Sequence, residues 1–371
     1  MNNDYQICTK CVMNTSASEI IFDEQGVCNF CHEYEEAKDT LWHRGEKGQR
    51  LLEQTLNRIK SEAKDKEYDC IIGLSGGVDS SYVAYLAKRV FNLRPLVVHV
   101  DTGWNSELAV KNIENIVRML DIDLYTHVID WEEMQDLQLA FFKSGIVYQD
   151  NPQDHAFVAV LRRIAKEKKI KYFITGANTA TECILPKSWS YNNIDAKLIK
   201  SINKKFGKLK IKTFPFISFL DYYLFYPFFH KIQRVNILNM MEYNKDDAMK
   251  VLQDELNWKY YGGKHHESIF TKFFQIYYQP IRFGFEKRRA HLASLIVTKQ
   301  MTREVALAEL QKPSYTEKEI KEDKIYIAKK LGLSFTEFEQ LMEIPPTYVT
   351  DFPNNSYWFK LIGKVKIFFK Q

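Results

Sequence analysis

Residues 69–90 read DCIIGLSGGVDSSYVAYLAKRV, and this stretch decides the expected fold. The short apolar run from Cys70 to Leu74 predicts a buried strand. After a Ser/Gly turn, apolar residues recur at helical spacing, as at Val83, Ala87 and Val90, and predict a helix. A strand, a glycine loop and a helix N-terminus in this order present backbone N–H groups and the positive end of the helix dipole to an anion.

The loop itself, SGGVDS at residues 75–80, is the expected phosphate-binding element. Its two glycines let the backbone approach a phosphate closely, and its serines add hydroxyl donors. Asp79 either orients the first helical turn or holds a magnesium ion. The G-x-x-x-x-G-K-[ST] pattern of a different phosphate loop is absent, and a glycine turn without a ligand is the alternative. We expect pyrophosphate to contact Ser75, Gly76, Gly77, Val78, Asp79 and Ser80.

Strand and helix patterns then alternate along the chain, which predicts an α/β fold with a doubly wound parallel sheet. The expected strands span 96–101, 123–129 and 172–175, and the expected helices span 106–120, 131–143 and 154–168. In such sheets ligands bind beyond the carboxyl ends of the strands. Asp101, Gly176 and Glu182 follow strand ends, as Ser75 does, so we expect one shared site. Taken by itself, Asp101 is equally suited to a turn.

Four of the six cysteines lie within the first 31 residues as two Cys-x-x-Cys pairs, namely Cys8, Cys11, Cys28 and Cys31. Their spacing falls within the range of four-thiolate zinc sites. Four thiolates complete a tetrahedron and leave no open coordination position, so we expect structural zinc. Two disulfides and an iron–sulfur cluster are the alternatives, and the lack of a recognisable secretory signal counts against the disulfides.

Composition excludes several classes of protein. The 371 residues predict two to three domains. Apolar residues at 45% and charged residues at 27% exclude a disordered or collagen-like chain. No apolar run reaches the length of a membrane span, and we expect a cytoplasmic protein. The net charge, 52 − 47 = +5, is too small by itself to indicate nucleic-acid binding.

Several motifs together resemble the N-acetyl sugar amidotransferase family of the ATP-pyrophosphatase (PP-loop) superfamily. They are CTKCVM at 8–13, CNFC at 28–31, SGGVDS at 75–80, VHVDTGWN at 98–105, TGAN at 175–178, ATE at 180–182, LP at 185–186, KHHES at 264–268 and FGFEKRRAH at 283–291. The resemblance extends to about residue 355. It covers members that modify pseudaminic- and legionaminic-type acids, and members that modify UDP-linked diacetamido uronic acids for the O-antigen of lipopolysaccharide.

The resemblance implies an ATP-dependent conversion of an acetamido group into an acetamidino group. The amide oxygen would attack the α-phosphorus of ATP, and ammonia would then displace AMP from the adenylyl imidate. ATP, Mg²⁺ and structural Zn²⁺ are the implied cofactors, with His99 at the nucleotide and Glu182 orienting magnesium or substrate. Because no cysteine lies in a glutaminase nucleophile motif, we expect a separate HisH-like glutaminase and a HisF-like cyclase subunit, resembling the pair of histidine biosynthesis.

The C-terminal third shows helical patterns and a dense set of basic residues. We expect Lys264, Arg282, Lys287 and Arg288, together with Glu267, to grip the substrate or stabilise the imidate. A solvated helix face is the alternative. The resulting division is a zinc knuckle at 1–45, an ATP-pyrophosphatase domain at 46–235 and a helical C-terminal region at 236–371.

One stretch stays outside this interpretation. Residues 197–212 contain seven lysines and no acid, and the aromatic run 214–229 follows. Lysine-rich stretches are usually solvated and aromatic runs are usually core. Their adjacency leaves a membrane-surface or partner-docking patch as an alternative.

A PP-loop tRNA thiotransferase is the second functional interpretation. Such chemistry needs reactive cysteines, and only Cys183, next to Glu182, is suitably placed. A non-enzymatic, zinc-bearing nucleotide-binding module is the third, and the intact loop and converging strand ends count against it. We therefore expect a sugar substrate and no nucleic-acid partner.

Overall fold

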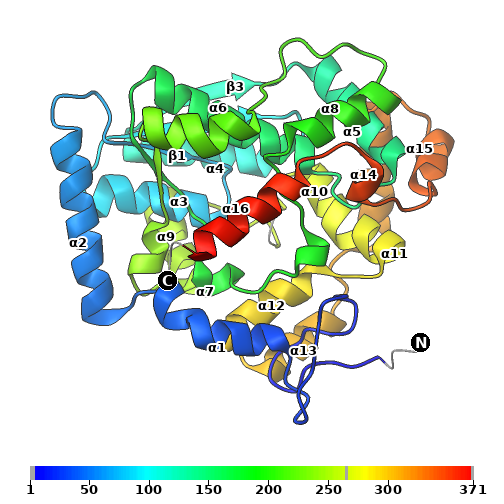
Figure 1. The fold of residues 1–371 in the computed structure, drawn as a ribbon, viewed down its shortest axis with the longest axis horizontal. Coiled ribbons are helices and arrows are strands. Elements are labelled where there is room, and N and C mark those ends of the chain that lie inside the picture. The colour runs from blue at the N-terminus through cyan, green and yellow to red at the C-terminus, as the bar shows by residue number, and fades with distance from the viewer. Residues whose placement is uncertain (1–4, 264–265, 369–371) are drawn as a thin grey trace.

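Five parallel strands form the centre of the fold (Figure 1). The computed structural model describes residues 5–263 and 266–368. The sheet order is β3-β2-β1-β4-β5. The strands are β1 (Cys70–Gly73), β2 (Pro95–Asp101), β3 (Asp123–Val128), β4 (Tyr172–Ile174) and β5 (Gln233–Val235). All neighbouring strands pair in parallel, with Ile72 opposite Val97 on one side and Ile174 on the other. The predicted doubly wound α/β fold is confirmed.

Helices connect the strands and cover both faces of the sheet (Figure 1). Ser106 and Asp130 cap α4 and α5 by accepting hydrogen bonds from backbone N–H groups of the first turn. Among the described residues, no helix is both long and apolar enough to cross a membrane. The helices of this part are α1 (Asn29–Leu41), α2 (Gly45–Glu62), α3 (Val78–Tyr85), η1 (Leu86–Val90), α4 (Glu107–Leu120), α5 (Trp131–Ser144), α6 (Asn151–Glu167), α7 (Thr179–Glu182), η2 (Lys187–Trp189), α8 (Ala196–Phe206), η3 (Asp221–Phe229) and η4 (Ile237–Met240).

The sheet separates two hydrophobic cores. Because successive side chains of a strand point to opposite faces, Ile71 enters one core, while Cys70 and Ile72 enter the other. Cys70 is fully buried, as expected of a small apolar core residue. Both faces of β1 and β2 are covered, which explains why these strands read as continuous apolar runs.

The C-terminal helices share the first of these cores with the sheet. Phe142 of α5 packs edge to face against Phe270, Tyr278 and Phe338 at centroid distances of 5.8, 5.5 and 5.6 Å. The predicted boundary at residue 235 is therefore crossed by apolar packing. The elements of this region are α9 (Lys245–Leu256), α10 (Ile269–Phe273), η5 (Phe274–Tyr278), α11 (Gln279–Phe283), α12 (Lys287–Val297), α13 (Arg303–Gln311), α14 (Glu317–Lys330), α15 (Phe335–Met342), η6 (Val349–Asp351) and α16 (Ser356–Phe368).

The N-terminal knuckle docks on α12 and α13, which lie beside it in Figure 1. Arg303 of α13 donates to the carbonyl oxygens of Cys8 and Cys11 at 3.0–3.2 Å. Arg289 of α12 donates to the carbonyl of Val12 at 3.2 Å. These contacts join residues 5–31 to the C-terminal region rather than leaving them as a tethered module.

Candidate nucleotide site and metal centre

A cavity of about 220 Å³ opens where the strand order reverses, between β1 and β4. Chain connections run outward from this point in both directions, so the loops after the two strands diverge and leave a crevice. Gly73 and Ser75 border the cavity from the β1 side, and Phe173, Thr175 and Gly176 border it from the β4 side. We refer to this cavity as the nucleotide pocket.

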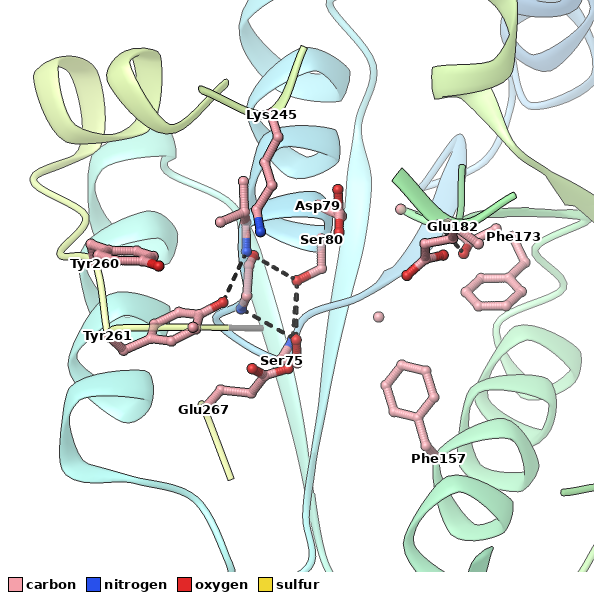
Figure 2. Close-up of a pocket in the computed structure, with 17 residues that line it drawn as sticks. Ser75, Asp79, Ser80, Phe157, Phe173, Glu182, Lys245, Tyr260, Tyr261 and Glu267 are labelled. Atoms are coloured by element: carbon pink, nitrogen blue, oxygen red, sulfur yellow. Dashed lines mark hydrogen bonds between the residues drawn. The ribbon is translucent and has the colours of Figure 1, made fainter. Parts of the chain in front are cut away.

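The predicted phosphate loop forms one wall of the pocket (Figure 2). The Gly77 N–H donates to Ser75 Oγ at 3.2 Å, and Ser80 Oγ donates to the Gly77 carbonyl at 3.2 Å. Ser75 Oγ and Ser80 Oγ lie 3.3 Å apart. Helix α3 begins at Val78, so the positive end of its dipole faces the cavity.

Three residues distant in sequence brace the loop. Trp258 Nε1 donates to the Gly76 carbonyl at 2.9 Å. The Val78 N–H donates to the hydroxyl of Tyr261 at 3.3 Å. The buried Asn112 of α4 holds this segment by exchanging two hydrogen bonds of 2.8 Å with the backbone of Lys259. Burial, and then the charge of Glu267, raises the pKa of Tyr261, so its hydroxyl keeps a proton to donate.

Asp79 is held in one orientation at the pocket wall. Its Oδ1 accepts from the hydroxyl of Tyr243 at 2.5 Å and from Asn178 Nδ2 at 3.2 Å. Burial is the largest cause that raises the pKa of Tyr243 well above its ordinary value, and the negative charge of Asp79 is the second. This tyrosine therefore stays neutral and donates. Asn178 also caps α7 through Oδ1, and it thereby fixes the helix that ends at Glu182.

Four charged side chains line the described part of the pocket: Asp79, Glu182, Glu267 and Lys245. Three carboxylates and one ammonium group would repel a bare triphosphate. A magnesium ion is usually held by one or two carboxylates plus substrate phosphates, so this set fits a metal–nucleotide complex. Three lining residues were not predicted from the sequence: Lys245, Tyr260 and Tyr261. Nothing in their local pattern points to the phosphate loop, which lies 165 or more residues earlier in the chain.

Two predicted nucleotide residues support the site from outside the cavity lining. The His99 ring lies with Nδ1 3.0 Å from the Leu74 carbonyl oxygen and Nε2 3.1 Å from Asn105 Nδ2. Asp101 Oδ1 accepts from the Gly103 N–H at 2.8 Å and from Asn105 Nδ2 at 3.1 Å. Both residues therefore order the loops after β1 and β2.

The predicted basic cluster separates in the structure. Arg282 Nη2 donates to the Ile344 carbonyl at 2.6 Å. Arg288 pairs with Glu286 at 2.7 Å and donates to three carbonyls at the end of α13. Both guanidinium groups hold C-terminal segments together and lie outside the pocket lining, and their role in substrate binding stays a prediction. Lys287 opens α12 outside the pocket lining, and Lys264 lies outside the described residues.

The four N-terminal cysteines converge on one point and are all fully buried. Their sulfurs are separated by 3.9 Å (Cys8–Cys31), 3.7 Å (Cys11–Cys28) and 3.7 Å (Cys28–Cys31). Disulfide sulfurs would lie about 2 Å apart. A tetrahedron with Zn–S bonds of about 2.3 Å has edges of about 3.8 Å. The spacing therefore matches four thiolates around one ion such as zinc.

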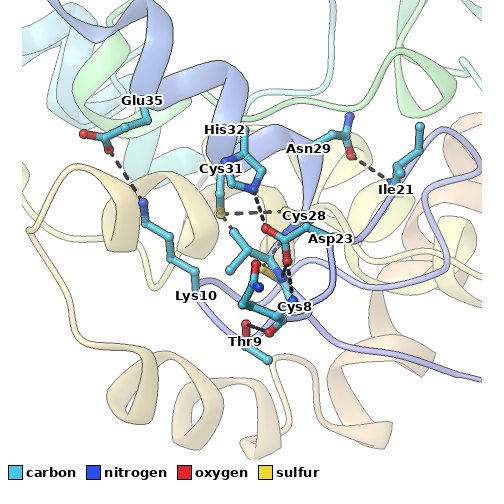
Figure 3. Close-up of polar contacts among 12 residues, drawn as sticks. Cys8, Thr9, Lys10, Ile21, Asp23, Cys28, Asn29, Cys31, His32 and Glu35 are labelled. Atoms are coloured by element: carbon cyan, nitrogen blue, oxygen red, sulfur yellow. Dashed lines mark hydrogen bonds and ion pairs between the residues drawn. The ribbon is translucent and has the colours of Figure 1, made fainter.

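The backbone around the sulfurs is arranged for thiolates. N–H groups of Cys11 and Cys28 point to Cys8 Sγ at 3.4 and 3.2 Å. Hydrogen bonding among the four sulfurs lowers the pKa of Cys8 and Cys28 and raises the pKa of Cys11 and Cys31. Asp23 ties the connecting loop by accepting from the Val27 N–H at 2.8 Å and lying 2.7 Å from His32 Nε2 (Figure 3).

Two protein-family models match parts of the chain. Residues 267–366 match the C-terminal domain of WbpG-like LPS biosynthesis proteins. Residues 51–208 match NAD synthase. The chain is therefore similar to NAD synthase over residues 51–208 and to WbpG-like LPS biosynthesis proteins over residues 267–366.

Individual relatives match part of the chain. The protein MJ1599 of Methanocaldococcus jannaschii is 28% identical over 173 residues, which are 46% of this chain and 58% of that protein. The glutamine-hydrolysing GMP synthase of Thermosipho africanus is 29% identical over 137 residues, which are 34% of this chain and 25% of the relative. The chain thus covers less than two thirds of the length of these relatives.

Solved structures resemble the chain more distantly. The NH₃-dependent NAD synthetase of Campylobacter jejuni aligns with a TM-score of 0.31 and 20% identity, over 57% of this chain and 85% of that one. The U34-tRNA thiolase NcsA of Methanococcus maripaludis, with its [4Fe-4S] cluster, aligns with a TM-score of 0.34 and 16% identity, over 91% and 88%. Likeness at this level does not distinguish the activity of an NAD synthetase from that of a tRNA thiolase.

Proposed function

We propose that this chain is a member of an N-acetyl sugar amidotransferase-like PP-loop family and converts an acetamido group of a bacterial surface-polysaccharide sugar into an acetamidino group. The amide oxygen attacks the α-phosphorus of ATP and releases pyrophosphate. Ammonia then attacks the imidate carbon, and the former amide oxygen leaves with AMP. The sum is acetamide, ATP and ammonia giving acetamidine, AMP and pyrophosphate.

The observation that carries the proposal is the phosphate loop at the β1–β4 switch point. Ser75, Gly77 and Ser80 place hydroxyl and N–H groups at the start of α3, which also lines the cavity. In this position the helix dipole and the loop favour the charge that develops on departing pyrophosphate. The Phe157 and Phe173 rings on the other side of the cavity offer apolar walls to a base (Figure 2).

The charged residues then divide into two roles. Asp79 and Glu182 would hold the Mg²⁺ that accompanies ATP, and this ion supplies charge neutralisation at the phosphates. Lys245 and the protonated hydroxyl of Tyr261 face the same phosphates as donors. Tyr243 and Asn178 keep Asp79 oriented, so little reorganisation is needed when the nucleotide binds.

Glu267 is positioned for the second half of the reaction. Its Oε1 lies within 3.4 Å of the position that a Cβ on Gly77 would occupy, directly beside the loop. A carboxylate there would accept a proton from the attacking nitrogen as AMP departs. We assign the ammonia supply to a HisH-like glutaminase with a HisF-like subunit, because the described residues bring no cysteine–histidine pair into the pocket.

The cysteines favour amidination over tRNA thiolation. Burial raises the pKa of Cys183 to about 11, so its thiol is protonated at neutral pH. Cys70 is fully buried in the core, and the other four cysteines surround one point. A sulfur relay requires an accessible thiolate, which none of these environments provides.

The test is to incubate the full chain with ATP, Mg²⁺, ammonium chloride and a panel of diacetamido sugars, and to measure AMP, pyrophosphate and sugar mass. We expect AMP in step with a sugar mass decrease of about one unit, because NH replaces oxygen. Asp79→Asn should abolish AMP formation. Asp65→Asn, which changes an exposed residue of the turn between α2 and β1, should not.

AMP formation that depends on tRNA and a sulfur donor would replace the proposal with thiolation. If ammonium chloride alone gives no product, the reaction is repeated with the purified glutaminase pair and glutamine. Absence of AMP under both conditions, with a folded protein, would refute the assignment.

A further inference from the structure

The longest aromatic run of the chain lies on the surface instead of in a core. Helix η3 has the sequence DYYLFYPFF, and none of its nine residues is buried. Phe228 and Phe229 are 70% and 68% exposed. The expectation of core aromatics for residues 214–229 is confirmed for the buried Phe214 and is wrong for the exposed residues of η3. A soluble protein rarely leaves a contiguous apolar segment uncovered unless it contacts something else.

A second helix enlarges the same surface. Tyr357 and Trp358 at the start of α16 are 71% and 51% exposed. Phe219, just before η3, contacts Trp358 and Phe359 at centroid distances of 6.4 and 5.6 Å. In Figure 1, α16 crosses the front of the molecule. We call the combined surface the aromatic patch; its exposed apolar members are Leu220, Leu224, Phe225, Phe228, Phe229, Tyr357, Trp358 and Leu361.

Hydrogen bonds fix the patch on the body of the protein. The buried Asp195 accepts from the N–H and the side-chain amide of Asn355 at 2.7 and 2.9 Å. Tyr191 Oη lies 3.0 Å from Ser356 Oγ. Asn192 donates to the hydroxyl of Tyr223 in η3 at 3.3 Å. One short segment, residues 191–195, therefore holds both η3 and α16 in place. The exposed aromatic side chains project from helices whose positions are fixed by these hydrogen bonds.

Positive charge borders this patch. Residues 196–240 contain eight lysines and one arginine but only one acid, Asp221, which accepts hydrogen bonds from Ser218. Lys200 Nζ lies 4.5 Å from the Phe216 ring, and Lys205 Nζ lies 5.2 Å from the Phe352 ring. The lysines of α8 thus lie beside the segments that lead into η3 and α16.

We propose that the aromatic patch docks this protein on the surface of a membrane that contains anionic phospholipids. Exposed Phe, Tyr and Trp side chains suit the boundary between headgroups and acyl chains. Lysines with almost no intervening acid suit a continuous layer of lipid phosphates. A protein partner would ordinarily meet both signs of charge at the rim, whereas the charges that residues 196–240 contribute are almost all positive. Glu133 and Asp136, which accept backbone hydrogen bonds from this segment, are buried.

The proposal is independent of the reaction at the nucleotide pocket, since the described lining of that cavity includes no patch residue. Docking would hold the protein at a membrane through this surface. Its success or failure is therefore distinguishable from that of the amidotransferase assignment.

The experiment is co-sedimentation of the full chain with vesicles of phosphatidylethanolamine and phosphatidylglycerol, compared with pure phosphatidylcholine vesicles. We expect binding to the anionic vesicles that weakens as salt is raised. The double variant Phe228→Ser/Phe229→Ser should bind at least about tenfold more weakly. The control Ile21→Ser removes a 70% exposed apolar residue of the N-terminal knuckle and should bind like the unmodified chain.

A second variant separates charge from apolar contact. Lys204→Gln/Lys231→Gln should reduce the salt dependence and leave thermal stability unchanged. Equal binding to both vesicle types, no binding, or unchanged binding of the Phe double variant would overturn the proposal. So would concentration-dependent dimerisation abolished by the same variant, because it would assign the patch to a second copy of the chain.

Discussion

Lys245 is the one cation among the described residues that line the nucleotide pocket. It is the first residue of α9, and its backbone N–H donates to Gln300 Oε1 at 3.2 Å, so the side chain leaves from a fixed point. Replacing it by glutamine keeps the length but removes the charge that faces the phosphates. We expect Lys245→Gln to lower kcat/KM for ATP by about 10- to 100-fold. The measurement is the rate of AMP release as the ATP concentration is varied.

The control for this substitution is Lys250→Gln, an exposed position on the same helix. It should leave kcat/KM for ATP unchanged, and both variants should unfold at the temperature of the unmodified chain. Equal loss in the two variants would show that the helix, and not the charge at the pocket, is responsible.

His155 gives the molecule a pH dependence that is separate from catalysis. The Ile217 N–H donates to Nε2 at 3.1 Å, so the proton of the neutral ring sits on Nδ1 and is donated to the Asn193 carbonyl at 2.7 Å. Burial lowers the pKa of His155 from 6.5 to about 4. Between these values the unfolded chain binds more protons than the folded chain, so stability falls as the pH is lowered.

We expect His155 to cost about 3 kcal/mol of unfolding free energy when the pH falls from 7 to 4. The measurement is urea unfolding of the unmodified chain and of His155→Gln between these pH values. The variant should be less stable at pH 7 but lose less stability on acidification. Parallel curves for the two proteins would contradict a buried neutral histidine.

At the scale of elements, the turn after β4 and the start of α3 pack without room for a side chain. A Cβ on Gly176 would lie 2.7 Å from the Asp79 carbonyl carbon and 2.9 Å from the Ser80 nitrogen. Both neighbours are backbone of the phosphate-loop helix. Gly176→Ala must therefore displace α3 relative to β4, at a cost of about 1–3 kcal/mol, and should also lower AMP formation.

Gly363→Ala in α16 is the matched control, because, apart from neighbouring residues and backbone of its own helix, no heavy atom of the described residues lies within 4 Å of the added Cβ. It should be neutral or slightly stabilising, since alanine favours a helix. Denaturant unfolding and AMP release on the two variants check the prediction. A Gly176→Ala chain with normal stability and activity would show that the two elements can separate freely.

These elements also show what the sequence could predict. The β1–loop–α3 unit and the strand ends were predictable, because an apolar run, two glycines and a helical period are local signals. β5 was not predicted, since Gln233–Val235 has three residues and carries Arg234 in its centre. The pairing of Trp258 with Gly76, and of Arg288 with the end of α13, depends on packing between distant segments. No local pattern encodes such contacts.

At the scale of the whole molecule, the metal centre is part of a shared core. The four cysteines pack in one hydrophobic cluster with Trp189, Phe285 and the apolar face of α12, and Trp189 stacks on Phe285 at 4.8 Å. Helix α12 in turn contacts α7, the helix that ends at Glu182. Disruption of the knuckle should therefore affect the nucleotide pocket as well as the N-terminus.

We expect elemental analysis to find one zinc ion per chain and Cys28→Ser to lose it. Folding of a four-thiolate knuckle depends on its metal, so the variant should lose more than about 3 kcal/mol of unfolding free energy.

Cys70→Ser, at a buried cysteine outside the cluster, should keep zinc although it is also destabilised. Iron in place of zinc would instead identify either a single iron on the same four thiolates, which sulfur separations of 3.7–3.9 Å also fit, or an iron–sulfur cluster, and assay of acid-labile sulfide distinguishes the two. A metal-free Cys28→Ser chain of unchanged stability would mean that the knuckle holds its shape through Arg289, Arg303 and apolar packing alone.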